Sequence, residues 1–355
     1  MDWRRARRLT LRSILRPGMW IGVRALLCAP LLPPPALRPS ALRMAHILDE
    51  SGLCAIDAWH ARATEALVAK LPVKARRDGS LDLSPPMEAT VRAWEPTSQS
   101  ERVAWCSALS LSTATYASRS ITVWNAPSVE VPHLFLRLGV STSGDAPEAP
   151  SPPTLELEID YRHRLAAGYE GVQPDGGYPE PTSREEFAQA SVRRMYDETF
   201  FTAEARRWWE AVHQADGAKP LRTPLTDAIV EGRRQFGGSS NEPCSGPLRV
   251  SLQFPLSDAA IEAAAEACEA AAARWLGWMA EAPDASWINN RRIYDRDCLV
   301  RLGVLRSHAA ALAVRLGSEE GMEVALVDAG PQDMMGHNLM QEQGGFGSDP
   351  DEGRD

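Results

Sequence analysis

The sequence has few of the motifs that mark nucleotide, metal or covalent-catalysis sites. Its 355 residues contain no P-loop, no G-x-S-x-G turn and no G-x-G-x-x-G after a predicted strand. The seven histidines form no H-E-x-x-H pair, and the six cysteines include no C-x-x-C pair. We therefore expect no metal site, and we interpret the cysteines as small apolar residues of a protein in a reducing compartment.

Acidic residues are nearly absent from residues 1–44, where Asp2 is the only one. Nine arginines are spread along this segment, and its apolar patch, MWIGVRALLCAPLL, is interrupted by Arg24 and too short to span a bilayer. This composition predicts an organellar transit peptide and no transmembrane segment. A secretory signal and a disordered basic tail of a cytosolic protein are the alternatives.

The acidity of the chain is concentrated after this segment. The whole chain carries a net charge of −9 and residues 1–44 carry +8, which leaves −17 on residues 45–355. A body this acidic is a poor nucleic-acid binder, so we expect no nucleic-acid partner. We divide the chain into a transit peptide (1–44), one folded domain (45–328) and a tail (329–355) that lacks periodicity and is expected to be disordered.

The clearest pattern in the chain is a pair of alternating segments between Val131 and Arg164. Alternation with a period of two predicts half-buried strands, and the Pro/Ser-rich connection allows the second strand to return antiparallel to the first. In the first strand Phe135 and Arg137 share the polar face, and in the second Glu158 and Asp160 do so. That face is predicted to be either a solvated surface or the wall of a ligand pocket.

Other segments predict a sheet covered by helices. Periodicity and capping residues indicate helices over Ala45–Leu71, from Thr182 or Ser183 to near Gly217, over Ser257–Trp278 and over Asp297–Leu316. Strands are indicated at Val103–Ser112, Ser120–Trp124 and Leu248–Phe254, whereas Val73–Pro96 predicts a loop or irregular strands. Because strands and helices do not alternate strictly, we expect an α+β fold with an antiparallel sheet.

Several of these segments, in the same order, resemble the red chlorophyll catabolite reductase family of the ferredoxin-dependent bilin reductases. The similarity spans roughly residues 100–320 and is one of pattern and order. PHLFLRL followed by LELEIDYRHR resembles the paired strands of the family, which end in an Asp-x-Pro-x-Arg turn: Asp160 and Arg164 match, and Arg162 stands at the proline position. MYDETFFTAEARRW, Phe236 before LRVSLQF, and DRDCLVRLG resemble later blocks of the family.

This resemblance implies an α-β-α sandwich, a central antiparallel sheet flanked by helices, with a linear tetrapyrrole bound between sheet and helices. It implies reduction of red chlorophyll catabolite to a fluorescent catabolite in the chloroplast stroma, a mitochondrial location being the alternative. Electrons would come from reduced ferredoxin, with no cofactor bound to the protein itself. Ferredoxin and the tetrapyrrole are the expected partners, and a homodimer is left open.

The resemblance also suggests site residues. Arg137 stands where the family has an acidic residue, and a second family acid falls near Ser307 or His308. A histidine can donate protons near neutral pH, so His308 is expected to replace that acid. We therefore nominate His308 and Asp160 as catalytic residues, and Arg137, Phe236, Asp297 and Arg301 as substrate-binding residues.

Each of these residues has a structural alternative. Arg137 can be a cross-strand ion-pair partner, His308 can lie on a helix face, and Asp160 can cap a turn. Asp297 and Arg301, four residues apart, can form a helical ion pair, and Phe236 can fill the core. The whole protein has alternatives too: a homologue that binds tetrapyrroles without reducing them, or a plastid scaffold that binds none.

Overall fold

A computed structural model of the chain describes residues 50–98, 102–142, 152–162, 198–221 and 248–284, together with 297, 301, 304–305, 308–313 and 315–330. Within these residues the centre is an antiparallel sheet of eight strands in the order β1-β2-β3-β4-β5-β6-β8-β7. The strands are β1 (Val73–Ser80), β2 (Glu88–Pro96), β3 (Val103–Ser112), β4 (Tyr116–Asn125), β5 (His133–Ser141), β6 (Thr154–Arg162), β7 (Lys219–Pro220) and β8 (Val250–Pro255).

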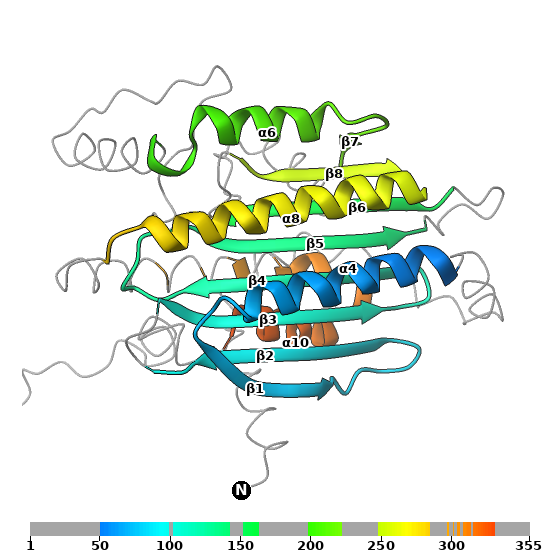
Figure 1. The fold of residues 1–355 in the computed structure, drawn as a ribbon. Coiled ribbons are helices and arrows are strands. Elements are labelled where there is room, and N and C mark those ends of the chain that lie inside the picture. Colours follow the sequence, from blue (N-terminus) through cyan, green and yellow to red (C-terminus); the bar gives the residue numbers. More distant parts are fainter. Residues whose placement is uncertain are drawn as a thin grey trace, which may run out of the picture.

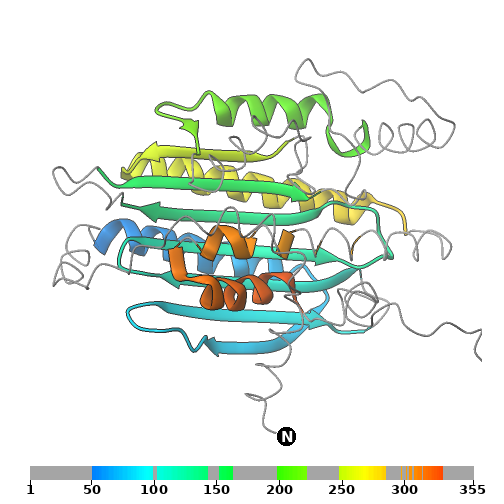
Figure 2. The same cartoon turned by 180° about the vertical axis from the view of Figure 1, so that it is seen from behind.

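Helices cover both faces of this sheet. Figure 1 shows α4 (Glu50–Val68) and α8 (Asp258–Glu281) on one face, and Figure 2 shows α10 (Ser318–Ala329) on the other. A fourth helix, α6 (Ala203–His213), lies beside β8 at one edge. The predicted α+β class and the α-β-α arrangement are confirmed.

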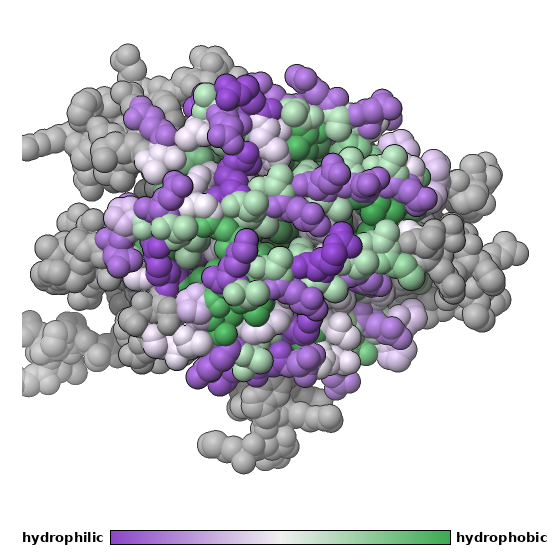
Figure 3. Space-filling model, in the orientation of Figure 1, coloured by the Kyte–Doolittle hydropathy of each residue, from purple (hydrophilic) through white to green (hydrophobic). Residues whose placement is uncertain are grey.

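The face under α4 and α8 is closed by apolar side chains. The helix predicted within Ala45–Leu71 is present as α4, and Ile56, Trp59, Ala63 and Leu67, which recur at helical spacing, are all buried in the core. In α8 the Ser257 side chain caps the helix by accepting a hydrogen bond from the Ala260 amide, and alanines line its inner side. Its exposed side carries glutamates, so the outer surface in Figure 3 mixes hydrophilic and hydrophobic residues.

Of the two alternatives for Val73–Pro96, irregular strands are found: β1 and β2 pair antiparallel, with a shift in register between Ala75 and Arg77. Strand β1 lies at the edge of the sheet and its side chains are exposed, which hides its pattern in the sequence. Two other predictions about elements need correction. The helix expected to continue to Gly217 begins anew at Ala203, because the Thr202 side chain accepts a hydrogen bond from the Ala205 amide and caps a separate helix. Helix α10 was not predicted at all.

The described residues include no helix that is both long enough and apolar enough to cross a membrane. Residues 1–49 and 331–355 lie outside the described part, so the transit peptide, the tail and the domain boundaries stay predictions.

Candidate functional site

The polar face predicted for β5 and β6 is turned toward α10. The register of the two strands places Phe135 opposite Asp160 and Arg137 opposite Glu158, as their alternation predicts. The intervening Leu134, Leu136 and Leu138 are fully buried on the opposite face, under α4 and α8. The face is therefore the inner wall of the molecule on the α10 side, and its charged groups are largely removed from water.

Arg137 lies at the centre of an ion-pair network on this wall. Its Nε is 2.8 Å from Oε2 of Glu158, its NH2 is 3.3 Å from Oε2 of Glu156, and its NH1 donates to the Tyr116 hydroxyl. The cross-strand ion pair considered for Arg137 is thus present. Contact between Arg137 and a ligand stays a prediction.

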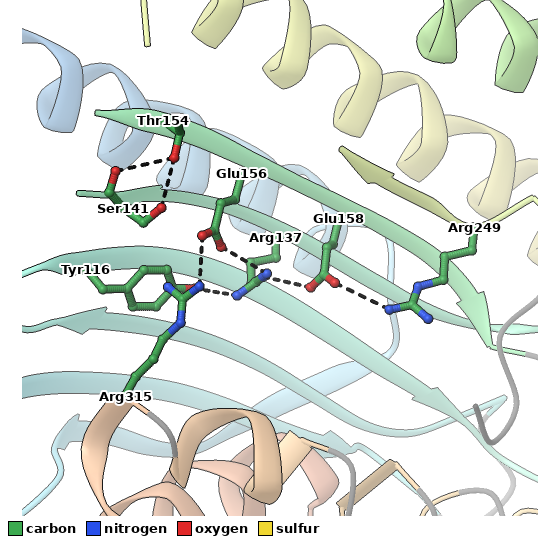
Figure 4. Close-up of polar contacts among 8 residues, drawn as sticks. All are labelled: Tyr116, Arg137, Ser141, Thr154, Glu156, Glu158, Arg249 and Arg315. Atoms are coloured by element: carbon green, nitrogen blue, oxygen red, sulfur yellow. Dashed lines mark hydrogen bonds and ion pairs between the residues drawn. The ribbon is translucent and has the colours of Figure 1, made fainter. Parts of the chain in front are cut away.

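Two further arginines extend the network into a row (Figure 4). Arg315, from the helical segment before α10, places NH2 2.8 Å from Oε1 of Glu156. Arg249, directly before β8, places NH2 3.5 Å from Oε1 of Glu158. Each glutamate is therefore held between two arginines, and the row joins three strands of the sheet to the layer that covers them.

This row keeps Glu158 ionised. Burial alone would raise the pKa of Glu158, but the charges of Arg137 and Arg249 outweigh it and lower the pKa to about 2. Glu158 is therefore an anion throughout the neutral range, and it cannot release a proton there. A proton donor for chemistry on this face has to be a different group.

A carboxylic acid of suitable strength is provided by Asp328, at the end of α10. Its side chain is almost completely buried, and Oδ2 lies 3.3 Å from Nδ1 of His308. Burial raises the pKa of Asp328 to about 6, against the opposing effects of Arg162, Ser107 and Thr122. A carboxyl group with this pKa can both hold and release a proton near neutral pH.

His308 lies beside the sheet, its ring edge-on to Phe135 with 6.2 Å between centroids. Burial and the charges of Arg162 and Arg137 lower its pKa to about 3, with Glu158 opposing them. The imidazole is therefore neutral at physiological pH, unlike the imidazole of ordinary pKa that we assumed. In this pair the transferable proton belongs to Asp328, and His308 is the group through which it can be exchanged.

Two tryptophans fix Asp328 in place. The Trp124 indole donates to the backbone oxygen of Asp328 at 2.6 Å, and the Trp105 indole to that of Val327 at 3.3 Å. Gly330 then ends the helix with φ +84°, and a Cβ there would lie 3.1 Å from the Trp105 ring. Asp328 was missed from the sequence, although a single acid in the apolar run VALVDAG is the pattern that could have identified it.

Asp297 and Arg301 are both buried next to β4 and β5. Asp297 Oδ1 is 3.3 Å from Nε2 of His133, whose Nδ1 accepts a hydrogen bond from the backbone N–H of Asn125. Because Nδ1 accepts a hydrogen bond, the ring proton of His133 is on Nε2, the nitrogen that faces the Asp297 carboxylate. The Arg301 guanidinium lies 4.7 Å from the centroid of the Trp124 ring. The structure thus brings both residues to the α10 side of the sheet.

Asp160 is also on this side, and it is 9% exposed. Asp160 lies within β6, which continues through Arg162, and not at the end of the strand. Burial lowers the pKa of Arg162, and the negative charge of Asp160 is the largest of the effects that oppose this lowering. Arg162 itself lies 4.3 Å over the Phe135 ring, a role that the sequence did not suggest. Phe236, the remaining predicted site residue, lies outside the described residues.

The cysteines of the described residues are free thiols. Cys106 and Cys268 are free and fully buried, as interpreted, and burial raises the pKa of the Cys106 thiol to about 12; Cys54 is free but exposed. Within the described ranges, no group of three or more His, Cys, Asp or Glu side chains could hold a metal ion.

No family model and no curated protein matches the chain. Among solved structures, the chain is similar to phytochromobilin synthase from tomato in complex with biliverdin, with 12% identity over 81% of this chain and 84% of that one and a TM-score of 0.48. At this identity and score, neither a family nor a function follows for this chain.

Proposed function

We propose that the protein reduces a linear tetrapyrrole, red chlorophyll catabolite, with electrons from ferredoxin. The observation that carries this proposal is the buried pair of Asp328 and His308, with pKa values near 6 and 3, beside an arginine-rich sheet face. The resemblance of the strand pair and the C-terminal segment to the red chlorophyll catabolite reductase family supplies the substrate and the electron donor.

The chemistry requires little more from the protein than positioning and protons. Reduction of one double bond in the pigment consumes two electrons, from two reduced ferredoxins, and two protons. Asp328 donates the first proton to the pigment radical anion and thereby becomes a carboxylate. The Asp328 carboxylate is then reprotonated through neutral His308, 3.3 Å away. As the Nδ1–H of the imidazole passes its proton to the carboxylate, Nε2 takes a proton from solvent on the partly exposed side of the ring, so His308 is neutral before and after the step.

The arginines of the row bind the carboxylates of the pigment. Arg137 and Arg315 are 13% and 22% exposed, so both are partly accessible to a carboxylate-bearing ligand. An enzyme that depends on ferredoxin would work in the plastid stroma, which agrees with the transit peptide expected from residues 1–44.

An anaerobic assay tests this proposal. The protein without residues 1–44 is mixed with red chlorophyll catabolite, ferredoxin, a ferredoxin reductase and reduced nicotinamide, and the absorption of the substrate is followed. We expect its loss together with the appearance of fluorescence. If the absorption persists while an authentic red chlorophyll catabolite reductase is active alongside, the proposed reaction is wrong.

A second candidate is a protein that binds the pigment without reducing it. It is favoured by Arg137, which stands where the related family has an acid and is occupied by Glu156 and Glu158. A spectral shift of the pigment on binding, without turnover, would identify this function. Absence of any shift would instead indicate the scaffold alternative.

A further inference from the structure

The carboxylate of Glu156 is held between two guanidinium groups that come from opposite walls of the site. Oε2 is 3.3 Å from NH2 of Arg137, on the neighbouring strand β5. Oε1 is 2.8 Å from NH2 of Arg315, on the covering helical segment. The Glu156 side chain is only 3% exposed. One carboxylate bridging two arginines is the arrangement by which proteins recognise carboxylate ligands, but here the carboxylate belongs to the chain (Figure 4).

Tyr116 orients both arginines without help from Glu156. Its hydroxyl accepts a hydrogen bond from Arg137, and the Arg315 guanidinium stacks 3.8 Å from the centroid of its ring. The ring can lie across β5 because residue 139 is glycine; a Cβ there would be 3.3 Å from the ring edge and the hydroxyl. The two cations are thus expected to stay in position when the carboxylate between them is exchanged.

The surroundings allow such an exchange. Arg315 is 22% exposed and Arg137 13%, so the site is open to solvent on the Arg315 side. Ser141 and Thr154 form a hydroxyl pair, 3.0 Å apart, farther along the same face, and both are partly exposed. A Glu156 side chain that leaves the arginines can turn toward these hydroxyl donors and water.

We propose that Glu156 occupies the place of a substrate carboxylate between Arg137 and Arg315, and that an acidic ligand binds by displacing it. The inference rests on the proposed function for the ligand's identity, a linear tetrapyrrole with carboxylate side chains. Glu156 is then an internal competitor. It keeps the arginine pair neutralised in the empty protein and selects pigments that carry a free acid, since an esterified pigment cannot replace its charge.

The test is the substitution Glu156→Gln, which removes the competing charge and conserves the shape of the side chain. Biliverdin and its dimethyl ester are titrated into both proteins, and binding is followed by absorbance. The variant is expected to bind biliverdin about tenfold more tightly than the wild type, because Arg315 has lost its carboxylate partner and Arg137 keeps only Glu158, and to bind the ester unchanged.

A matched control is Glu95→Gln. Glu95 also bridges two cations, Lys74 and Arg76, each at 3.3 Å, but on the exposed pair β1–β2. It should leave both affinities unchanged. An affinity for biliverdin that stays equal or falls in Glu156→Gln overturns the proposal, and so does an equal gain for acid and ester.

Two further measurements keep the inference testable. If Glu156→Gln fails to fold, Arg315→Gln is tested in its place. This variant is expected to bind biliverdin about tenfold more weakly and the ester with unchanged affinity; unchanged affinity for the acid overturns the proposal.

Sodium acetate, compared with sodium chloride at equal ionic strength, should raise the melting temperature of Glu156→Gln and not that of the wild type. If acetate stabilises Glu156→Gln but neither protein binds the pigment, the proposed function is contradicted and this inference is not. If the pigment binds but Glu156→Gln does not bind it more tightly, this inference is contradicted and the proposed function is not.

Discussion

The face of the sheet under α4 and α8 and the face under α10 are built from alternate residues of the same strands. On β5, Leu134, Leu136 and Leu138 belong to the first face, whereas Phe135 and Arg137 belong to the second. The first face is a continuous apolar core. On the second, apolar residues of β2 and β3 pack against α10, and charged residues occupy β5 and β6.

This difference separates stability from chemistry within one sheet. Burial of apolar groups is favourable without any partner, so the first face needs only complementary shapes. Buried charges are costly unless paired, so the second face requires the arginine and glutamate row and specific hydrogen bonds. Arrangements of that cost are typical of ligand and catalytic sites, and the following substitutions are designed to separate the two faces by their effects.

The largest effect is expected for Asp328→Asn on the charged face. Loss of a positioned general acid lowers rates by about 100-fold or more, so ferredoxin-driven reduction should fall by that factor. Unfolding by urea should show stability equal to or above that of the wild type, because the amide removes a buried charge. The control Asp78→Asn, on the exposed strand β1, should alter neither quantity. A variant Asp328→Asn that keeps full activity would exclude Asp328 as the acid.

The opposite result is expected for Leu136→Ala on the apolar face. Leu136 is fully buried between Ile121 and Ile159, and the cavity should cost about 2–5 kcal/mol of unfolding free energy, measured with urea. The activity of the protein that remains folded should be nearly unchanged. Leu276→Ala, at a partly buried position of α8, should cost less than half as much. A loss of activity without a loss of stability would contradict the separation of the two faces.

Sequence patterns predicted the local elements well and the site only in part. The alternation of β5 and β6 identified Arg137, Glu158 and Asp160 as one polar face, because the period of a strand is a local property. Helix α8 could be predicted equally well, because Ser257 defines its start and an alanine-rich run defines its inner side.

Contacts between distant segments could not be read in the same way. The pairing of Arg315 with Glu156 joins residues 159 positions apart, and Asp328 meets β3 and β4 only after α10 folds back onto the sheet. The pKa values of Asp328 and His308 depend on that burial, so the ordinary pKa assumed for a histidine did not apply. For Val73–Pro96, a loop and irregular strands could not be distinguished from the sequence, because the side chains of β1 are exposed on both sides of the strand.

A smaller effect is expected in the pH dependence of stability. Burial lowers the pKa of His60, on the inner side of α4, to about 4, so between pH 6.5 and 4 the unfolded chain binds a proton that the folded chain does not. Stability therefore falls as pH falls through this window, by up to about 3 kcal/mol. The raised pKa of Asp328 acts oppositely, because the folded chain binds its proton first as pH falls below 6.

Urea unfolding of single variants from pH 7 to 4 resolves the two contributions. Relative to the wild type, His60→Gln should lose less stability on acidification and Asp328→Asn should lose more. If the unfolding free energy of all three proteins changes equally with pH, burial does not shift the pKa of His60 or of Asp328 as described.

The smallest effect concerns the two edges of the sheet. A ferredoxin is acidic, and so is this chain, so the proposed docking needs a local basic patch. The sequence offers arginine doublets beginning at Arg193, Arg206 and Arg291. The first and third lie outside the described residues, whereas Arg206 and Arg207 are exposed on α6, beside the β8 edge. Reversing both to glutamate should raise the KM for ferredoxin by about three- to tenfold at low salt and leave kcat unchanged. The same reversal of Arg76 and Arg77, exposed on β1 at the opposite edge, should have little effect. Since screening removes such attractions, the two variants should converge at high salt, and an equal response of both edges would show that ferredoxin does not dock at α6.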